Sequence, residues 1–198
     1  MFCDFRHGLL KGLTRFTTLQ NLFPESARRQ ATFKYFESIK TLTHTRRAPL
    51  FWLQYAIGCV VFKEYSRAEE YFATSYAFAG TRPSYDTYQI DNHYARFLIV
   101  RAIDEPSGAD VMSAFREART LLYRQMHKER LDYPYRVAKA FGEFYDTFSH
   151  SLSGAEKQEM VSAARQISER INKLPSSRRE NRNVRECWDE MQRIIDQS

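Results

Sequence analysis

The sequence has few turn-forming residues, with 7 Gly and 6 Pro in 198 positions. β-Sandwiches and barrels need turn signals about every 8–12 residues, so this scarcity argues against a many-stranded β protein. No stretch reaches the roughly 20 uncharged apolar residues of a membrane span. The first 23 residues carry charges that interrupt any signal-peptide core, at Asp4, Arg6, Lys11 and Arg15. We therefore expect neither a membrane segment nor a secretory leader.

Cysteine is also scarce. Cys3, Cys59 and Cys187 are odd in number and far apart, which fits neither a metal site nor a redox pair. Cys59 lies in an apolar run, where a buried thiol is ordinary. These features favour reduced thiols and a cytoplasmic protein.

The motifs of common catalytic sites are missing. The sequence has no Gly-rich phosphate loop, no nucleophile elbow and no His-Glu-x-x-His pair. Its five histidines are scattered singly, at His7, His44, His93, His127 and His150. We therefore expect no enzymatic activity, no cofactor and no metal site.

Helix-forming residues fill the long stretches between the prolines, and 43% of the chain is hydrophobic. Apolar residues recur with helical spacing, as in the stripe Val111, Phe115, Ala118, Leu122 and Met126. The pattern predicts helices near residues 5–22, 25–43, 49–63, 66–79, 84–103, 108–128, 133–149, 154–173 and 180–196. Short connections force neighbouring helices to lie antiparallel. The predicted fold is all-α, with antiparallel helical hairpins stacked as a short α-α superhelix.

We expect this superhelix to form a single helical-repeat domain over residues 1–198. Within it, residues 1–48 form basic N-terminal helices, residues 49–174 form the repeat hairpins, and residues 175–198 form a C-terminal helix.

One segment, residues 51–79, carries a repeat-like pattern: FWLQYAIGCVVFKEYSRAEEYFATSYAFA. Ile57 and Gly58 occupy the Leu-Gly positions of a first helix, and Ala68 and Phe72 supply the Ala-x3-Phe of a second helix. The segment resembles a tetratricopeptide repeat.

The spacing around this segment agrees with that resemblance. Pro49 and Pro83 stand 34 residues apart, the length of one tetratricopeptide repeat. A looser copy of the second-helix pattern follows 43 positions later, at Val111, Phe115 and Ala118. The resemblance implies that the first helices of successive hairpins line a concave groove that holds a peptide.

A second resemblance concerns the segments APLFWLQYAIGCVVF and IDNHYARFLI, within residues 48–99. They are similar to the helical-repeat sensor regions of large bacterial defence and signalling NTPases. This resemblance implies a stand-alone or separated sensor part of a defence or signalling system.

The helix predicted at 84–103 carries a polar stripe beside its apolar one. Gln89, Asn92, His93 and Arg96 follow at i, i+3, i+4 and i+7, and Asp86 extends the stripe by about one turn. Arg96 could hold a carboxylate or phosphate through its planar fork, and Asn92 and His93 could add hydrogen bonds. In the alternative interpretation this stripe faces solvent, and Asn92 and Arg96 form an ordinary i,i+4 contact.

Other first helices supply neighbouring groove candidates. These are Gln54 and Lys63 in the helix at 49–63, and Arg136 and Lys139 in the helix at 133–149. Together with the polar stripe they predict a non-catalytic scaffold or sensor that binds a protein or peptide.

The basic charge is concentrated at one end. Residues 1–50 contain nine Lys and Arg against three acids, an excess of six that equals the net charge of the whole chain. The alternative function is therefore nucleic-acid binding through this basic region, with phosphate contacts from Arg28, Arg29, Arg46 and Arg47. A second basic cluster follows near the C-terminus, at Arg178, Arg179, Arg182 and Arg185.

Overall fold

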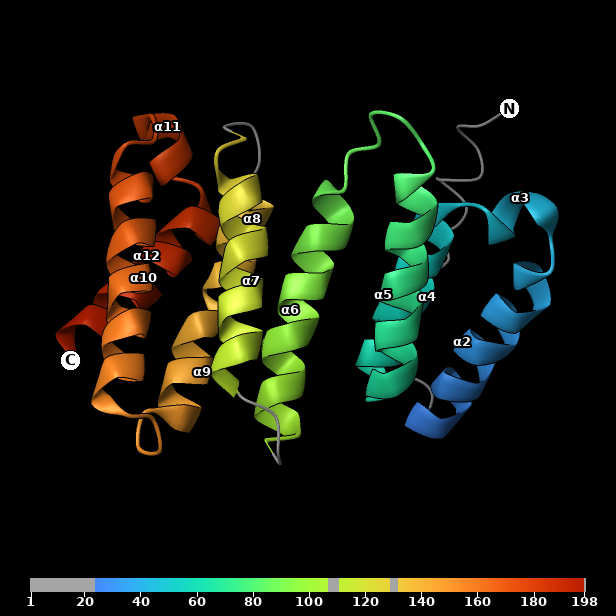
Figure 1. Ribbon diagram of the computed structural model, residues 1–198, viewed down its shortest axis with the longest axis horizontal. Helices are drawn as coiled ribbons and strands as arrows, with labels where there is room; N and C mark the ends of the chain where they lie inside the picture. The colour runs from blue at the N-terminus through green and yellow to red at the C-terminus, as the bar shows by residue number, and fades with distance from the viewer. Residues whose placement is uncertain (1–23, 107–110, 129–131, 198) are drawn as a thin grey trace. The chain divides into compact units, whose positions relative to one another are not determined.

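A computed structural model describes residues 24–106, 111–128 and 132–197 of the chain (Figure 1). Every regular element within these ranges is a helix, which confirms the predicted all-α class. The described backbone packs as two compact units that divide between Thr81 and Arg82, and each unit is described by itself. The helix expected at 5–22 lies outside the described residues, and the division into one repeat domain stays a prediction.

The first unit contains a helical hairpin preceded by two further helices. The preceding helices are α2 (Glu25–Lys40) and the single turn α3 (Thr43–Arg46), and the hairpin consists of α4 (Pro49–Val61) and α5 (Tyr65–Gly80). Pro49 occupies the first turn of α4, where its missing N–H costs no hydrogen bond. The buried Ser75 hydroxyl donates to the Pro49 carbonyl over 2.8 Å and ties the two hairpin helices together.

Aromatic rings fill the core of this unit around Tyr55. Its ring stacks on Phe36 at 4.6 Å and lies 4.3 Å from the ring of Tyr71. The Tyr55 hydroxyl donates to the Glu37 carboxylate over 2.5 Å and accepts from Arg67 over 2.9 Å. Burial, followed by the hydrogen bond to Glu37, raises the pKa of Tyr55 well above its usual range. Tyr55 is therefore a neutral core residue that joins α2, α4 and α5.

The second unit contains α6 (Tyr88–Asp104), α7 (Val111–Met126), α8 (Tyr133–Ala138), α9 (Ala140–Phe148), α10 (Gly154–Asn172), the single turn α11 (Ser176–Arg179) and α12 (Arg182–Asp196). Helix α10 begins with a capping box, in which Ser153 accepts from the Glu156 N–H and Glu156 accepts from the Ser153 N–H. Helix α12 buries a single apolar stripe, at Val184, Cys187, Met191 and Ile194.

The helices of the second unit form two layers. One layer holds α6, the α8–α9 pair and α12, and the other holds α7 and α10; Figure 1 shows α10 lying in front of α12. Contacts in the first layer join residues 40 positions apart between α6 and α8, and 47 positions apart at two places between α9 and α12. Contacts between α7 and α10 span 40 and 43 positions. The equal offset at two places before α12, and the similar offsets between α7 and α10, show that these neighbouring helices run in the same direction.

The observed offsets exceed the 34-residue spacing predicted from Pro49 and Pro83. In the 47-residue offset, part of the excess comes from the extra turn α11, which precedes α12. Helix pairs of this kind are compatible with a helical-repeat fold. The helix predicted to begin at residue 84 begins instead at Tyr88, after Ser84 takes a left-handed backbone conformation with φ of 62°.

Candidate ligand groove

A hollow of about 710 Å³ lies along the first layer of the second unit. We name it the Arg96 groove. Helices α6, α8, α9 and α12 all contribute to it, and its walls are formed by Arg96, Val100, Tyr133, Arg136, Val137, Lys139, Ala140, Glu143, Asp146, Glu186, Asp189, Glu190 and Arg193.

The lining residues recur with helical spacing, so on each helix they lie on one face. Arg96 and Val100 are one turn apart on α6, and Arg136 and Ala140 are one turn apart across the junction of α8 and α9. On α12 the groove residues likewise recur at intervals of three or four. The side-chain stripes of α6, of the α8–α9 pair and of α12 therefore line one hollow.

Ion pairs at α12, two of them to the α8–α9 segment, line one side of the groove. Lys139 contacts Glu186 at 2.6 Å, and Arg193 contacts Asp146 at 2.6 Å and Glu190 at 2.8 Å. Hydrogen bonds from Lys139, and secondly from Arg182, lower the pKa of Glu186 to about 2. The charges on this side of the groove therefore neutralise one another within the protein.

Gly142 lies beneath the same wall. A Cβ placed on Gly142 would lie 2.0 Å from Glu190 Oε2 and 2.7 Å from a guanidinium nitrogen of Arg193. Glycine therefore leaves room for the Glu190–Arg193 pair against α9.

Another part of the groove is formed by Arg96, Arg136 and Tyr133. The Arg136 guanidinium lies 5.7 Å from the centre of the Tyr133 ring, which is within cation–π range. Behind Tyr133 lies His93, with 5.3 Å between the two ring centroids. Burial, with the positive charges of Arg96 and then Arg136, lowers the pKa of His93 to about 4. His93 is thus neutral at pH 7, and it sits in a region of positive potential.

The structure separates the residues of the predicted polar stripe. Arg96 is exposed in the groove, and His93 is half-buried behind Tyr133. Asn92 is fully buried, and its Nδ2 donates to the Tyr88 carbonyl of the same helix over 2.7 Å. Gln89 is exposed and is not a wall residue of the groove. Only Arg96 of these four residues lines the hollow directly.

Of the other residues predicted for the groove, some line it and some do not. Asp86 contacts Lys128 at 2.7 Å and accepts from the N–H of Tyr88, the first residue of α6, over 3.0 Å. Gln54 is half-buried on α4 in the first unit. Arg136 and Lys139, which were predicted as neighbours of Arg96, do line the same groove. Whether any of these residues contacts a ligand stays a prediction.

A buried carboxylate next to this stripe was not predicted. Asp91 is fully buried, and it accepts hydrogen bonds from Gln125 over 2.5 Å and from Thr87 over 3.1 Å. The sequence contains a signal for it, because Asp91 takes the first place of a buried helical stripe continued by Ala95 and Leu98. An acid in such a stripe indicates a buried polar contact between helices.

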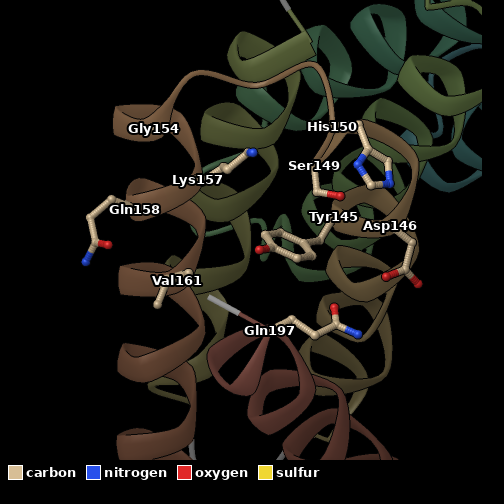
Figure 2. A pocket seen from close by; sticks show the side chains of 9 residues that line it. All are labelled: Tyr145, Asp146, Ser149, His150, Gly154, Lys157, Gln158, Val161 and Gln197. Carbon is tan, nitrogen blue, oxygen red and sulfur yellow. The ribbon is translucent and has the colours of Figure 1, made fainter.

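Two further hollows occur in the second unit. One, of about 760 Å³, lies between the end of α9, the start of α10 and Gln197. Figure 2 shows Tyr145 and Lys157 pointing into this space, whereas Gln158 points away from it. The other, of about 660 Å³, includes the exposed Trp188 with Arg179, Arg182 and Arg185.

The basic residues proposed for nucleic acid are partly engaged in the protein. Arg29 pairs with Glu64 across the first unit, and Arg28 is half-buried. Arg46 and Arg47 are exposed at the end of α3. The basic residues before Pro24 lie outside the described residues, so a basic surface over residues 1–50 stays a prediction.

Within residues 24–106, 111–128 and 132–197, His, Cys, Asp and Glu form no group of three that could hold a metal ion. No helix of the described chain is long and apolar enough to cross a membrane. Comparisons with protein-family models, with curated proteins and with solved structures find no match to this chain.

Proposed function

We propose that the chain is a non-catalytic, cytoplasmic helical-repeat module that binds a protein or peptide in the Arg96 groove. The observation that carries this proposal is the position of the groove. It runs along the layer that holds α6, α8–α9 and α12, and side chains from all of them reach it. Neighbouring helices from successive hairpins form an elongated surface that suits an extended chain better than a small compact molecule.

The composition of the groove supports the same proposal. Its walls combine apolar residues, such as Val100, Val137 and Ala140, with charged side chains of both signs. Apolar walls can bury the side chains of a peptide while the charges fix its register and orientation. We propose kinship with tetratricopeptide repeats on the pattern at residues 51–79, with a longer unit of about 40–47 residues in the second half.

The resemblance of residues 48–99 to sensor regions of bacterial defence and signalling NTPases suggests the setting. In that setting the groove would recognise a trigger protein or a partner of the signalling system. We propose this role as the more specific form of the binding function.

Selection from a random peptide library on the full chain tests the binding function. Selected peptides should bind the wild type and lose about 10-fold or more in affinity when Ala140→Trp or Val100→Trp fills the groove. Ser162→Trp is the matched control, because Ser162 is exposed on α10 and is not a wall residue of the groove. Circular dichroism of each variant checks that the helices are intact. Failure to select any peptide, or equal binding by the filled variants, would contradict the proposal.

The alternative is nucleic-acid binding through the basic residues 1–50. It is tested by titrating labelled single-stranded DNA and RNA over a range of salt concentrations. Binding that weakens steeply with salt and is reduced by Arg46→Gln with Arg47→Gln would favour the alternative. Weak retention even at low salt would remove it.

A further inference from the structure

The charges that line the Arg96 groove fall into two groups. Lys139 and Arg193 are each paired with carboxylates of the wall. Arg96 and Arg136 form no ion pair with any described carboxylate, although both are exposed in the same hollow. The groove therefore presents two cations whose charge the described protein does not neutralise.

The two unpaired arginines lie in the same part of the groove. Both act on the half-buried His93 as nearby positive charges, and both lie close to Tyr133. Two guanidinium groups that share a site repel each other, and a carboxylate between them would relieve this repulsion. The fork of each guanidinium matches the two oxygens of a carboxylate.

A negative charge lies farther along the α8–α9 side of the groove. Glu143 is exposed in the groove and forms no ion pair with any described cation. It follows Arg136 by seven residues on the α8–α9 pair, which is two helical turns, or roughly 10 Å along the axis. An extended peptide in the polyproline II conformation advances about 3.1 Å per residue and returns to the same face every three residues, so side chains three positions apart span this separation on one face.

We infer that the Arg96 groove selects an extended peptide whose carboxylate lies between Arg96 and Arg136 and whose basic side chain, about three positions away, lies at Glu143. This inference rests on the proposed peptide-binding function and specifies the ligand of that site. The carboxylate belongs either to an Asp or Glu side chain or to the end of the peptide chain. The chemistry of both sources is the same.

The peptides selected from the library provide the first test. They should be enriched in an acidic and a basic residue separated by two intervening positions. Synthetic peptides then separate the two sources of the carboxylate. If a side chain supplies it, replacing Asp by Asn weakens binding and amidating the C-terminus has no effect. If the chain end supplies it, amidation weakens binding. Either result supports the inference.

Variants of the protein then test the contacts themselves. Arg96→Met and Arg136→Met should each weaken the acidic peptide about 10-fold or more, the expected loss of a charge-assisted hydrogen bond. Against the matching neutral peptide these variants should have little effect. Arg185→Met is the control, because Arg185 is exposed on α12 and does not line this groove.

The basic contact is tested by exchanging charges. Glu143→Lys should weaken the selected peptide, and replacing the peptide's basic residue by Asp should restore binding to this variant. One pattern would overturn the inference and leave the peptide-binding function standing. In that pattern Ala140→Trp blocks the peptide, but neither arginine variant changes the affinity and the selected peptides show no charge preference. If Ala140→Trp fails to block the peptide, the binding function itself fails.

Discussion

The imidazole of His93 on α6 lies against the ring of Tyr133 on α8, and the Tyr133 hydroxyl is 3.4 Å from both ring nitrogens. This contact joins the first helices of two successive hairpins directly behind the Arg96 groove. It also places a titratable ring beside the two unpaired arginines, so His93 can report on the charge of the groove.

His93 makes the stability of the protein depend on pH. Its pKa is lowered to about 4 in the folded state, whereas an unfolded histidine titrates near about 6.5. Between these values the unfolded chain binds the proton more tightly, so stability falls as the pH drops from about 6.5 to about 4. Urea unfolding at several pH values should show a weaker dependence in His93→Gln. If the free energy of unfolding depends on pH equally in the wild type and in this variant, His93 does not titrate in this way.

The arginines of the groove contribute to this pKa. Burial is its largest cause, followed by Arg96 and Arg136. Arg96→Met should therefore raise the pKa of His93 part of the way toward about 6.5, as followed by NMR of the imidazole protons. Arg185→Met should leave the pKa unchanged. A rise of equal size in both variants would point to a general loss of positive charge.

The buried Asp91 depends on its partner Gln125. Gln125 is itself buried and donates to the Asp91 carboxylate. Gln125→Met keeps a similar side-chain size but removes a donor, and it should cost about 2 kcal/mol in the free energy of unfolding. Arg124 lies 3.7 Å from the same carboxylate with a side chain that is 57% exposed. Arg124→Met should cost less than about 1 kcal/mol in the same urea titration, and an equal loss in both variants would contradict this account.

The turn between α4 and α5 holds Lys63 in a left-handed conformation, with φ of 57°. Non-glycine residues are strained there by roughly 1–2 kcal/mol. Lys63→Gly should therefore be more stable than Lys63→Ala by about 1 kcal/mol in thermal or urea unfolding. Both variants lack the lysine side chain, so their difference measures the backbone alone. Greater stability of the alanine variant would contradict the claim that the backbone at residue 63 is strained.

Much of the fold could be predicted from the helical periodicity of apolar residues and from the positions of proline and glycine. The hairpin at residues 49–80 follows from Pro49, from the apolar stripes and from the small buried Ala68. The α8–α9 junction at Lys139 could not be predicted, because no Pro or Gly marks it. The short turns α3 and α11 were missed because four-residue helices carry no periodic signal.

The candidate site was predictable only in part. Arg96, Arg136 and Lys139 follow from placing first helices side by side, and they meet in the groove. The sequence did not show that α12 supplies another wall of the groove, because that depends on the docking of a helix far along the chain. Helix spacing predicts Asn92 on a polar surface, but the structure buries it, because spacing alone does not show which neighbour covers a residue.

An NMR titration of the isotopically labelled full chain with a selected peptide tests the central claim most directly. The account predicts that the backbone shifts change most at Arg96, Val100, Arg136 and Ala140, together with the ring signals of His93. It also predicts that Arg96→Met weakens the titration while Arg185→Met does not. Shift changes confined to the outer face of α7 and α10, or to residues 24–81, would contradict the claim that this groove is the binding site.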